Sequence, residues 1–481
     1  MTAALRRRAV RPRLLPGLAF LATLALPALA LAAEVPHLDG RELGPLWVVP
    51  FVGVLLSIAV LPLAAPVIWH HHFGKITAGW TLAFLIPFAM RYGLDMTAGE
   101  VLHTALLEYI PFIILLTALF TVAGGVRLKG ALVGTPLANT VGLALGTALA
   151  SVMGTTGASM LLIRPLLRAN DQRRYKVHTV VFFIFLVANI GGSLTPLGDP
   201  PLFLGFLKGV SFFWPTTHLI GPAAFAAAIL LVVYFVTDWV LYAREGGKEP
   251  LTEEFKEPLA IEGKVNFLLL GAIVGAVLLS GVWHPGGGLN VMGVVLPWES
   301  IASQALLLLI TGLSLHLTEA ESRRMNAFTW GPMLEVAKLF AGIFLTMIPA
   351  LAILRAGTEG SLGAIIAAVN HDGQPVPAAY FWASGILSSF LDNAPTYLVF
   401  FNTAGGDAAH LMGEWALTLT AISAGSVFMG ANSYIGNAPN FMVKAIAEER
   451  GVKMPSFFGY MAWSCGILVP LFGLITVVFF R

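Results

Sequence analysis

The 481-residue chain is strongly apolar, with 57% hydrophobic and only 11% charged residues and a mean hydropathy of +0.81. Globular domains carry about a quarter charged residues, so this composition excludes an ordinary soluble domain. Apolar runs of about 18 to 25 residues recur along the chain and indicate a polytopic helical membrane protein in contact with lipid. The net charge of +2 offers no strong field to nucleic acid or another polyanion.

The N-terminal segment, residues 1–33, has the order of features of an export signal. It begins with five arginines, continues as a long apolar stretch, and ends with small residues at Ala28, Ala30 and Ala33. This order is typical of a bacterial secretory signal peptide with an Ala-x-Ala cleavage site; the alternative is a retained first membrane helix. In either case residues 34–44 are expected outside, and the protein is expected in the bacterial inner membrane as a multi-pass protein.

The first half of the chain, 45–243, is predicted to begin with three spans, at about 45–68, 76–95 and 100–123, with HHHFGK (70–75) as a cytoplasmic flank at the membrane interface. An apolar segment at 131–153 follows, then the polar tip TTGAS and a short apolar segment that ends in RPLLRANDQRRYK. Basic residues flank both ends of this unit, so the positive-inside rule places both ends in the cytoplasm. We therefore expect a re-entrant hairpin that opens to the cytoplasm.

A broken span is predicted next. The chain crosses outward through 177–198, where VVFFIFLVANI runs into GGSLTPLGDPP, and it returns through about 218–243. Non-helical backbone at membrane depth is tolerated only where it is buried in protein or lines a water-filled cavity. The charged loop at 244–264 is the one evident linker, is expected in the cytoplasm, and divides the chain into two halves.

The second half, 265–479, is predicted to repeat this plan. Its spans lie at about 265–283, 299–317 and 333–355, its hairpin arms at 377–391 and 396–404 around the tip DNAPT, and its last two spans at 415–447, which contains ANSYIGNAPN, and at 455–479. No Lys or Arg occurs between Thr358 and Glu414, so the second hairpin is expected to open to the outside. The two hairpins therefore have opposite predicted orientations.

A hairpin tip followed by a broken helix thus occurs twice in the sequence. The fold class expected is an all-α polytopic membrane protein with two inverted repeats, each containing a re-entrant hairpin and a discontinuous transmembrane helix. Interrupted apolar segments at matching places in two such halves indicate the binding site of a secondary transporter.

The motifs GGSLTPLGDPP, SSFLDNAP and GNAPN resemble those of the ion transporter superfamily, which includes NhaD-type sodium/proton antiporters and citrate and dicarboxylate carriers. The resemblance covers roughly residues 45–479 and implies a homodimer. In the dicarboxylate carriers it also implies a substrate carboxylate held between two hairpin tips with sodium at each tip. Those roles would fall here on residues of TTGAS and DNAPT, namely Thr155, Thr156, Ser159, Asn393 and Thr396.

Two carboxylates at membrane depth favour a cation as cargo. A charged side chain near the bilayer centre costs about 2.5–3.5 kcal/mol on insertion scales, so Asp199 and Asp392 are functional candidates. Sodium takes oxygen ligands. We expect one site at Asp199 with Thr155, Thr156, Ser193 and Thr195, and a second at Asp392 with Asn393, Thr396, Ser433 and Asn437. The alternatives are that Asp392 is only a helix N-cap and that Asp199 is only a turn residue.

The function predicted from these features is sodium/proton antiport by alternating access, in which each carboxylate binds either sodium or a proton. The alternative is a sodium- or proton-coupled citrate or dicarboxylate symporter. The sequence has no HExxH, GxSxG or Walker motif, which disfavours an enzyme, and a channel would not need two inverted units. No cofactor is expected apart from sodium as the transported or coupling ion.

Overall fold

The computed structural model describes residues 38–130, 133–246 and 260–481. These residues are mostly helical, and ten of their helices are long and apolar enough to cross a membrane. The all-α polytopic class predicted from composition is therefore confirmed. The predicted signal peptide or first helix at 1–33 lies outside the described residues, as does most of the predicted linker at 244–264.

The first three predicted spans are present with shifted bounds. The segments in order are η1 (Gly40–Glu42), η2 (Pro45–Val48), α2 (Val49–Ala64), α3 (Pro66–Tyr92), α4 (Leu94–Thr104), the π-helical turn η3 (Ala105–Tyr109) and α5 (Ile110–Ala123). The HHHFGK segment, predicted as a flank between two spans, lies inside α3. Pro66 suits the first turn of a helix, and α3 continues to Tyr92, so these histidines extend the span.

The predicted arms of the first hairpin are two helices separated by Gly154 alone, and the predicted break follows them. The elements are β1 (Arg127–Lys129), α6 (Pro136–Met153), α7 (Thr155–Ala169), α8 (Val177–Leu186), the 3-10 turn η4 (Ile190–Leu194), α9 (Pro200–Leu207) and α10 (Trp214–Arg244). Helix α9 begins at the two prolines of GDPP because a proline lacks the N–H that the first turn of a helix leaves unused.

The second half shows the same order of hairpin and break. Its elements are β2 (Ala260–Glu262), α11 (Val265–Val282), β3 (Gly288–Val291), β4 (Val294–Pro297), α12 (Trp298–Leu317), α13 (Ala320–Met325), α14 (Gly331–Arg355), η5 (Gly357–Glu359), α15 (Gly363–Val369), β5 (Asn370–His371), β6 (Gln374–Pro375), α16 (Pro377–Phe390), α17 (Asn393–Thr403), α18 (Ala408–Met412), α19 (Ala416–Phe428), η6 (Met429–Asn432), α20 (Ala438–Glu449) and α21 (Phe457–Phe479). The span predicted at 415–447 is thus two helices, α19 and α20, with a break between them.

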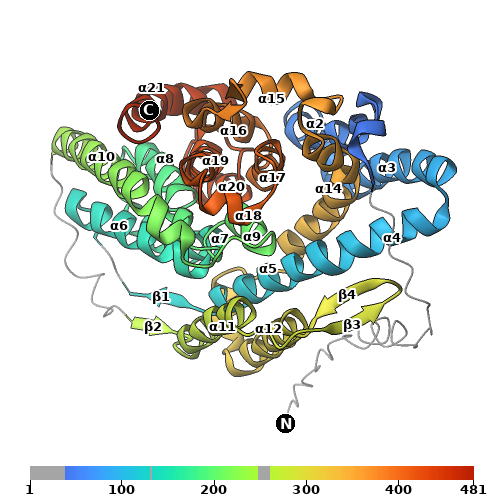
Figure 1. Cartoon of the computed structure of the whole chain (residues 1–481). Helices are drawn as coiled ribbons and strands as arrows, with labels where there is room; N and C mark the ends of the chain where they lie inside the picture. The colour runs from blue at the N-terminus through green and yellow to red at the C-terminus, as the bar shows by residue number, and fades with distance from the viewer. Residues whose placement is uncertain (1–37, 131–132, 247–259) are drawn as a thin grey trace, which may run out of the picture.

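The two halves pack into each other rather than forming separate lobes (Figure 1). Helix α5 of the first half lies against α11 and α12 of the second, α9 lies against α17, and α7 lies against α20. The short strands β1 and β2 also pair across the halves, and Arg127 forms an ion pair with Glu262 at 3.0 Å. These contacts bring the two predicted breaks into one interior.

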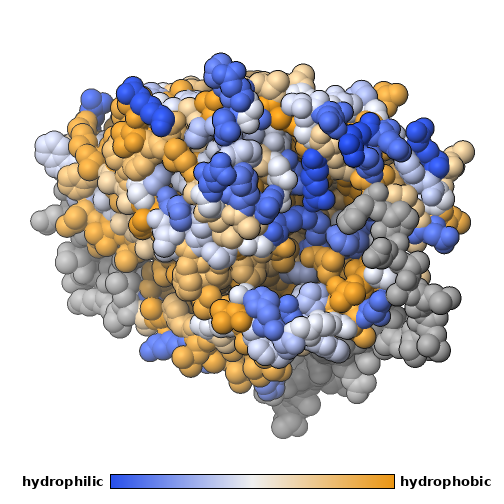
Figure 2. All heavy atoms as spheres, in the orientation of Figure 1, coloured by the Kyte–Doolittle hydropathy of each residue, from blue (hydrophilic) through white to orange (hydrophobic). Residues whose placement is uncertain are grey.

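The outer surface is apolar, as expected for helices in lipid. Large apolar side chains such as Leu56 of α2, Val232 of α10 and Leu309 of α12 are exposed, and apolar residues cover much of the face in Figure 2. The polar side chains at the breaks are instead buried between the helices, in the interior of the molecule. The structure therefore combines a lipid-facing exterior with a polar interior, which is the arrangement that a transport site needs.

Candidate functional site

The first break brings two stretches of backbone into close contact. A Cβ atom on Gly198 would lie 2.1 Å from the carbonyl oxygen of Gly192, so only glycine fits at this crossing. The amide of Thr155, at the tip between α6 and α7, donates a hydrogen bond to the carbonyl oxygen of Gly198 at 2.8 Å. The hairpin tip is thereby attached directly to the break, immediately before Asp199.

Hydroxyl groups fix the rest of the first break. Ser151 Oγ donates to the carbonyl oxygen of Gly191 at 2.5 Å, and Thr195 Oγ1 donates to the carbonyl oxygen of Ser151 at 2.5 Å. These bonds satisfy backbone groups that the interrupted helix leaves without helical partners. The backbone can therefore remain non-helical inside the membrane.

The second break repeats these bonds at a constant spacing. Ser389 Oγ donates to the carbonyl oxygen of Met429 at 3.2 Å, and Ser433 Oγ donates to the carbonyl oxygen of Ser389 at 2.5 Å. Both Ser389 and Ser433 lie 238 positions after their counterparts Ser151 and Thr195, the same separation that divides Asp199 from Asn437. The two breaks thus share a hydrogen-bond pattern, with Asp199 in one at the position of Asn437 in the other.

At the centre, the two tips and the two breaks meet on one carboxylate. Thr155 Oγ1 donates to Asp199 Oδ1 at 3.0 Å, Asn437 Nδ2 donates to the same oxygen at 3.1 Å, and Asn393 Nδ2 donates to Asp199 Oδ2. We call these four residues the central cluster. Each of them is at most 3% exposed.

The electrostatics of the central cluster leave Asp199 without a balancing charge. Within the described residues its carboxylate has no ion-pair partner, and its hydrogen-bond donors are neutral. A buried carboxylate in this position requires a proton or a cation to offset the cost of desolvation.

One polar atom beside Asp199 has no partner. Asn393 is fully buried and its Nδ2 donates to Asp199, yet its Oδ1 has no hydrogen-bond partner among the described residues. A buried amide oxygen without a donor costs free energy, so such an atom indicates a place for a ligand or water. Its position next to a carboxylate favours a cationic ligand.

The structure brings together members of both predicted sites. Thr155 and Asp199, from the predicted first site, contact Asn393 and Asn437, from the predicted second site. The remaining predicted hydroxyls donate to backbone carbonyl oxygens: Ser193 to Ile190, Thr195 to Ser151, Thr396 to Asp392 and Ser433 to Ser389. Thr156 is half-buried at the first tip.

Asp392 lies apart from the central cluster as a cap of helix α17. Its Oδ1 accepts a hydrogen bond from the amide of Ala394 at 3.0 Å, and the residue is only partly buried. Asp at this position satisfies an amide that the first helical turn leaves free. The capping alternative from the sequence therefore has a geometric basis, and among the described residues the hydrogen-bond partners of Asp199 are Thr155, Asn393 and Asn437 rather than Asp392.

Two asparagines that the sequence analysis did not single out join the breaks directly. Asn189 Nδ2 donates to Asn440 Oδ1 at 2.7 Å, and Asn440 Nδ2 donates to the carbonyl oxygens of Gly430 and Ser433. Asn437 also donates to Asn189 Oδ1 at 3.3 Å. A signal was present, since both residues are amides inside the broken apolar segments, but their contact joins positions 251 apart.

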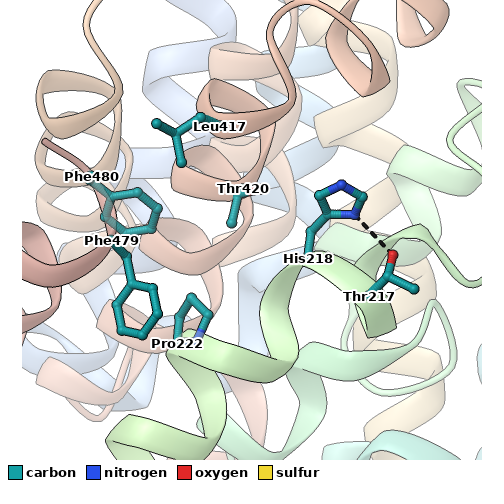
Figure 3. Close-up of a pocket in the computed structure, with 7 residues that line it drawn as sticks. All are labelled: Thr217, His218, Pro222, Leu417, Thr420, Phe479 and Phe480. Carbon is teal, nitrogen blue, oxygen red and sulfur yellow. Dashed lines mark hydrogen bonds between the residues drawn. The ribbon is translucent and has the colours of Figure 1, made fainter.

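A groove elsewhere in the molecule is separate from this centre. It has a volume of about 270 Å³ and is lined by residues of α10, α19 and α21, with His218 and Thr217 forming its polar end (Figure 3). None of the predicted site residues lines it. The polar centre at Asp199 is instead formed by side chains that are each at most 3% exposed.

The apolar spanning helices and the polar interior at two helix breaks together define a multi-pass membrane transporter. Residues 40–480 match the family described as "Putative citrate transport". The chain therefore belongs to this citrate-transporter-like family of ion transporters and is a secondary transporter. No curated protein matches the chain.

Proposed function

We propose that the protein is a cation/proton antiporter, most simply for sodium, in which Asp199 binds either the cation or a proton as the central cluster is exposed alternately to each side of the membrane. The observation that carries the proposal is a fully buried carboxylate whose partners in the described part of the chain are all neutral. In an apolar interior that carboxylate requires a positive partner, and sodium and a proton compete for it.

The atoms around Asp199 are suited to a hard cation. Sodium prefers oxygen ligands, and the central cluster offers carboxylate oxygens, the Thr155 hydroxyl oxygen and the unpartnered Asn393 Oδ1. A half-turn of the Asn393 amide would replace its donor with this oxygen. Asp392, which directly precedes Asn393 at the second tip, is proposed as a second carboxylate that adds to the negative field.

The architecture proposed for this exchange is two inverted repeats, with α6–α7 and α16–α17 as re-entrant hairpins and the boundary between repeats in the linker at 244–264. Support comes from the matched hydrogen bonds at Ser151 and Ser389 and from the contact between their two breaks in one centre. Oppositely oriented halves allow the same centre to be reached from either face. A homodimer in the bacterial inner membrane completes the proposal.

The second candidate is sodium- or proton-coupled symport of citrate, which the family match favours. In that case the central cluster would bind the coupling cation, and the cation would offset charge on the anionic substrate. The contacts of Asp199 favour the antiporter, because its hydrogen-bond partners in the described part of the chain include no arginine or lysine that could bind a carboxylate of citrate.

One transport assay separates the candidates. Purified protein in proteoliposomes is tested in parallel for sodium-, lithium- and potassium-driven dissipation of a pH gradient and for uptake of labelled citrate under a sodium gradient. The antiporter proposal expects cation-driven proton movement without citrate. Citrate uptake that requires sodium or protons, with no exchange in its absence, would replace it with the symporter.

Thiol labelling tests the inverted hairpins. In a Cys465→Ser background, Ala409→Cys after the second hairpin should react with an impermeant reagent outside, and Gln172→Cys after the first only after permeabilisation. Both parent residues are exposed, so reactivity reports sidedness. Labelling of both cysteines from the same side would contradict the proposed inversion.

A further inference from the structure

An intramembrane ion pair lies away from the central cluster and takes no part in the exchange described above. Lys208 Nζ lies 2.5 Å from Glu108 Oε1, and the two side chains are only 16% and 13% exposed. The pair joins residues 100 positions apart, one in the span Leu94–Ala123 and the other just after helix α9. Charged side chains at membrane depth are costly and usually functional.

The first partner lies on an irregular turn. Glu108 belongs to η3, where five residues adopt π-helical hydrogen bonding between α4 and α5. Such single π turns are rare and are frequent at functional sites, because they redirect side chains that a regular helix would point elsewhere. Residues 100–123 were predicted as one span, and the π turn within it is an additional observation from the structure.

The second partner ends the short helix that Asp199 begins. Asp199 is the residue before α9, the helix runs from Pro200 to Leu207, and Lys208 is its C-cap. Gly209 follows with φ of +100°, a conformation that favours glycine. Because α9 has a non-helical break before it and a sharp turn after it, it can move as a rigid unit. Its eight residues are about 12 Å long.

Helix α9 is packed closely against the rest of the molecule, and its residues Leu202, Phe203 and Leu204 are each at most 4% exposed. On one side Gly205 lies so close to Tyr397 of α17 that a Cβ atom would be 2.4 Å from the tyrosine hydroxyl. On the other side Phe203 stacks on Phe112 of α5 at 6.4 Å between ring centroids. These contacts pack the middle of α9, and the Lys208–Glu108 pair adds a directional polar contact at its far end.

We propose that Glu108 and Lys208 are positioning residues of the transport site, whose ion pair anchors the far end of α9 to the π turn and so holds Asp199 in the arrangement seen here. The inference rests on the proposed function and adds a mechanical partner to the same site. A buried ion pair contributes little net stability but is well suited to selecting one register over another. Its release accompanies the change to the alternate state.

Loss of the Glu108–Lys208 ion pair should shift the equilibrium between the two transport states and leave the ion-binding groups themselves unchanged. Removing the pair disfavours the state in which Asp199 is held, so the apparent affinity for the cation should rise at one membrane face and fall at the other. A residue with a purely structural role would reduce the amount of folded protein and the maximal rate, and would leave the half-saturating concentrations unchanged.

The test uses the full-length protein with Glu108→Gln, Lys208→Met and the charge-swapped double variant Glu108→Lys/Lys208→Glu. Proton exchange, or citrate uptake if that is the cargo, is measured against sodium concentration in vesicles of each orientation. Each single variant should change the half-saturating sodium concentration by about fivefold or more. The double variant should return it towards the wild-type value.

A matched control is the exposed pair of Glu321 and Arg324, 2.8 Å apart, where Glu321→Gln should change nothing. An unchanged half-saturating sodium concentration in folded single variants would overturn the proposal. So would a charge-swapped variant whose value is no closer to wild type than that of either single variant.

A readout without cargo separates the proposal from the proposed function. In Cys465→Ser/Thr156→Cys protein, Glu108→Gln should alter the rate of thiol labelling at the first tip. Altered labelling supports the ion pair even if the wild type moves neither cargo; an unaltered rate contradicts it.

Discussion

The two helix breaks have nearly the same backbone hydrogen bonds but different charges. Ser151 with Thr195 and Ser389 with Ser433 make matching bonds, and both breaks end in a proline-led helix. The residue before that helix is Asp199 in the first break and Asn437 in the second. The difference teaches that the backbone scaffold occurs in both halves, whereas at this matching position only the first half supplies a carboxylate.

The side-chain contacts that hold the two hairpins also differ in charge. At the base of the first hairpin, Asp238 of α10 is fully buried and accepts hydrogen bonds from Arg173, His178, Asn139 and Tyr234. In the second half, Trp382 of α16 donates to Thr476 of α21 at 3.0 Å, and Thr476 lies 238 positions after Asp238. At these two matching positions, a charged network therefore supports the first hairpin and a neutral hydrogen bond supports the second.

The largest expected effect comes from making the two breaks alike. Asp199→Asn places an amide in both breaks, removes the only carboxylate of the central cluster, and should reduce cation-dependent exchange by about 100-fold or more. Exchange is measured as dissipation of a pH gradient in inverted vesicles with matched protein levels. The control Asp392→Asn keeps a capping side chain on α17 and should have a much smaller effect. Normal exchange in Asp199→Asn would exclude Asp199 as the shared ligand.

The amide of the second break should matter less than the acid of the first. Asn437→Ala removes one hydrogen bond to the Asp199 carboxylate and should weaken apparent cation affinity by about tenfold, the usual value for a bond to a charged group. The change in affinity is measured as the half-saturating concentration of sodium in the exchange assay. An unchanged value would show that the second break contributes packing alone.

The hairpin supports can be compared through stability. Asp238→Asn leaves the guanidinium of Arg173 buried with one carboxylate partner fewer, and should cost about 3 kcal/mol. Thr476→Val at the matching position loses one neutral hydrogen bond and should cost about 1 kcal/mol. The half-life of folded protein in detergent at a fixed elevated temperature measures both. Equal losses would mean that the charged network has no special role.

The smallest effect is expected outside both units, in the exposed contact of Arg41 with Asp39 and Glu359. Hydrogen bonds from Arg41 hold the pKa of Asp39 below its ordinary value of 3.8. A carboxyl group whose pKa is lower in the folded than in the unfolded chain stabilises the fold at pH values above its unfolded-state pKa. This stabilisation is lost as the pH falls through its folded-state pKa. Asp39→Asn should therefore leave the thermal stability at pH 7 without measurable change, and any difference from wild type should disappear once the pH falls below the lowered pKa of Asp39 in the folded protein.

The helices and their breaks were predictable because hydropathy and proline are local signals. The arms of both hairpins, the GDPP helix start and the interrupted span before GNAPN all appear in the structure close to their predicted positions. The HHHFGK flank was misplaced, since a histidine run can extend a helix as readily as end it.

The contacts of the site were less predictable, because they depend on distant packing. The sequence indicated Asn393 and Asn437 as ligands but grouped them around Asp392, whereas they contact Asp199, 194 and 238 positions away. Glu108 was visible as a charge in an apolar span, yet nothing local identifies Lys208 as its partner. The π turn that directs Glu108 has no sequence signature of its own.

The way in which α5 lies against α11 and α12 has a consequence for biogenesis. Until the second half has been synthesised, the first half lacks these contacts. Helix α9 cannot yet pack against α17, and Asp199 cannot yet accept hydrogen bonds from Asn393 and Asn437. The nascent first half must therefore wait in the bilayer in an unfinished state. It follows that the final step of assembly, rather than the insertion of any one helix, buries the Asp199 carboxylate between the two breaks.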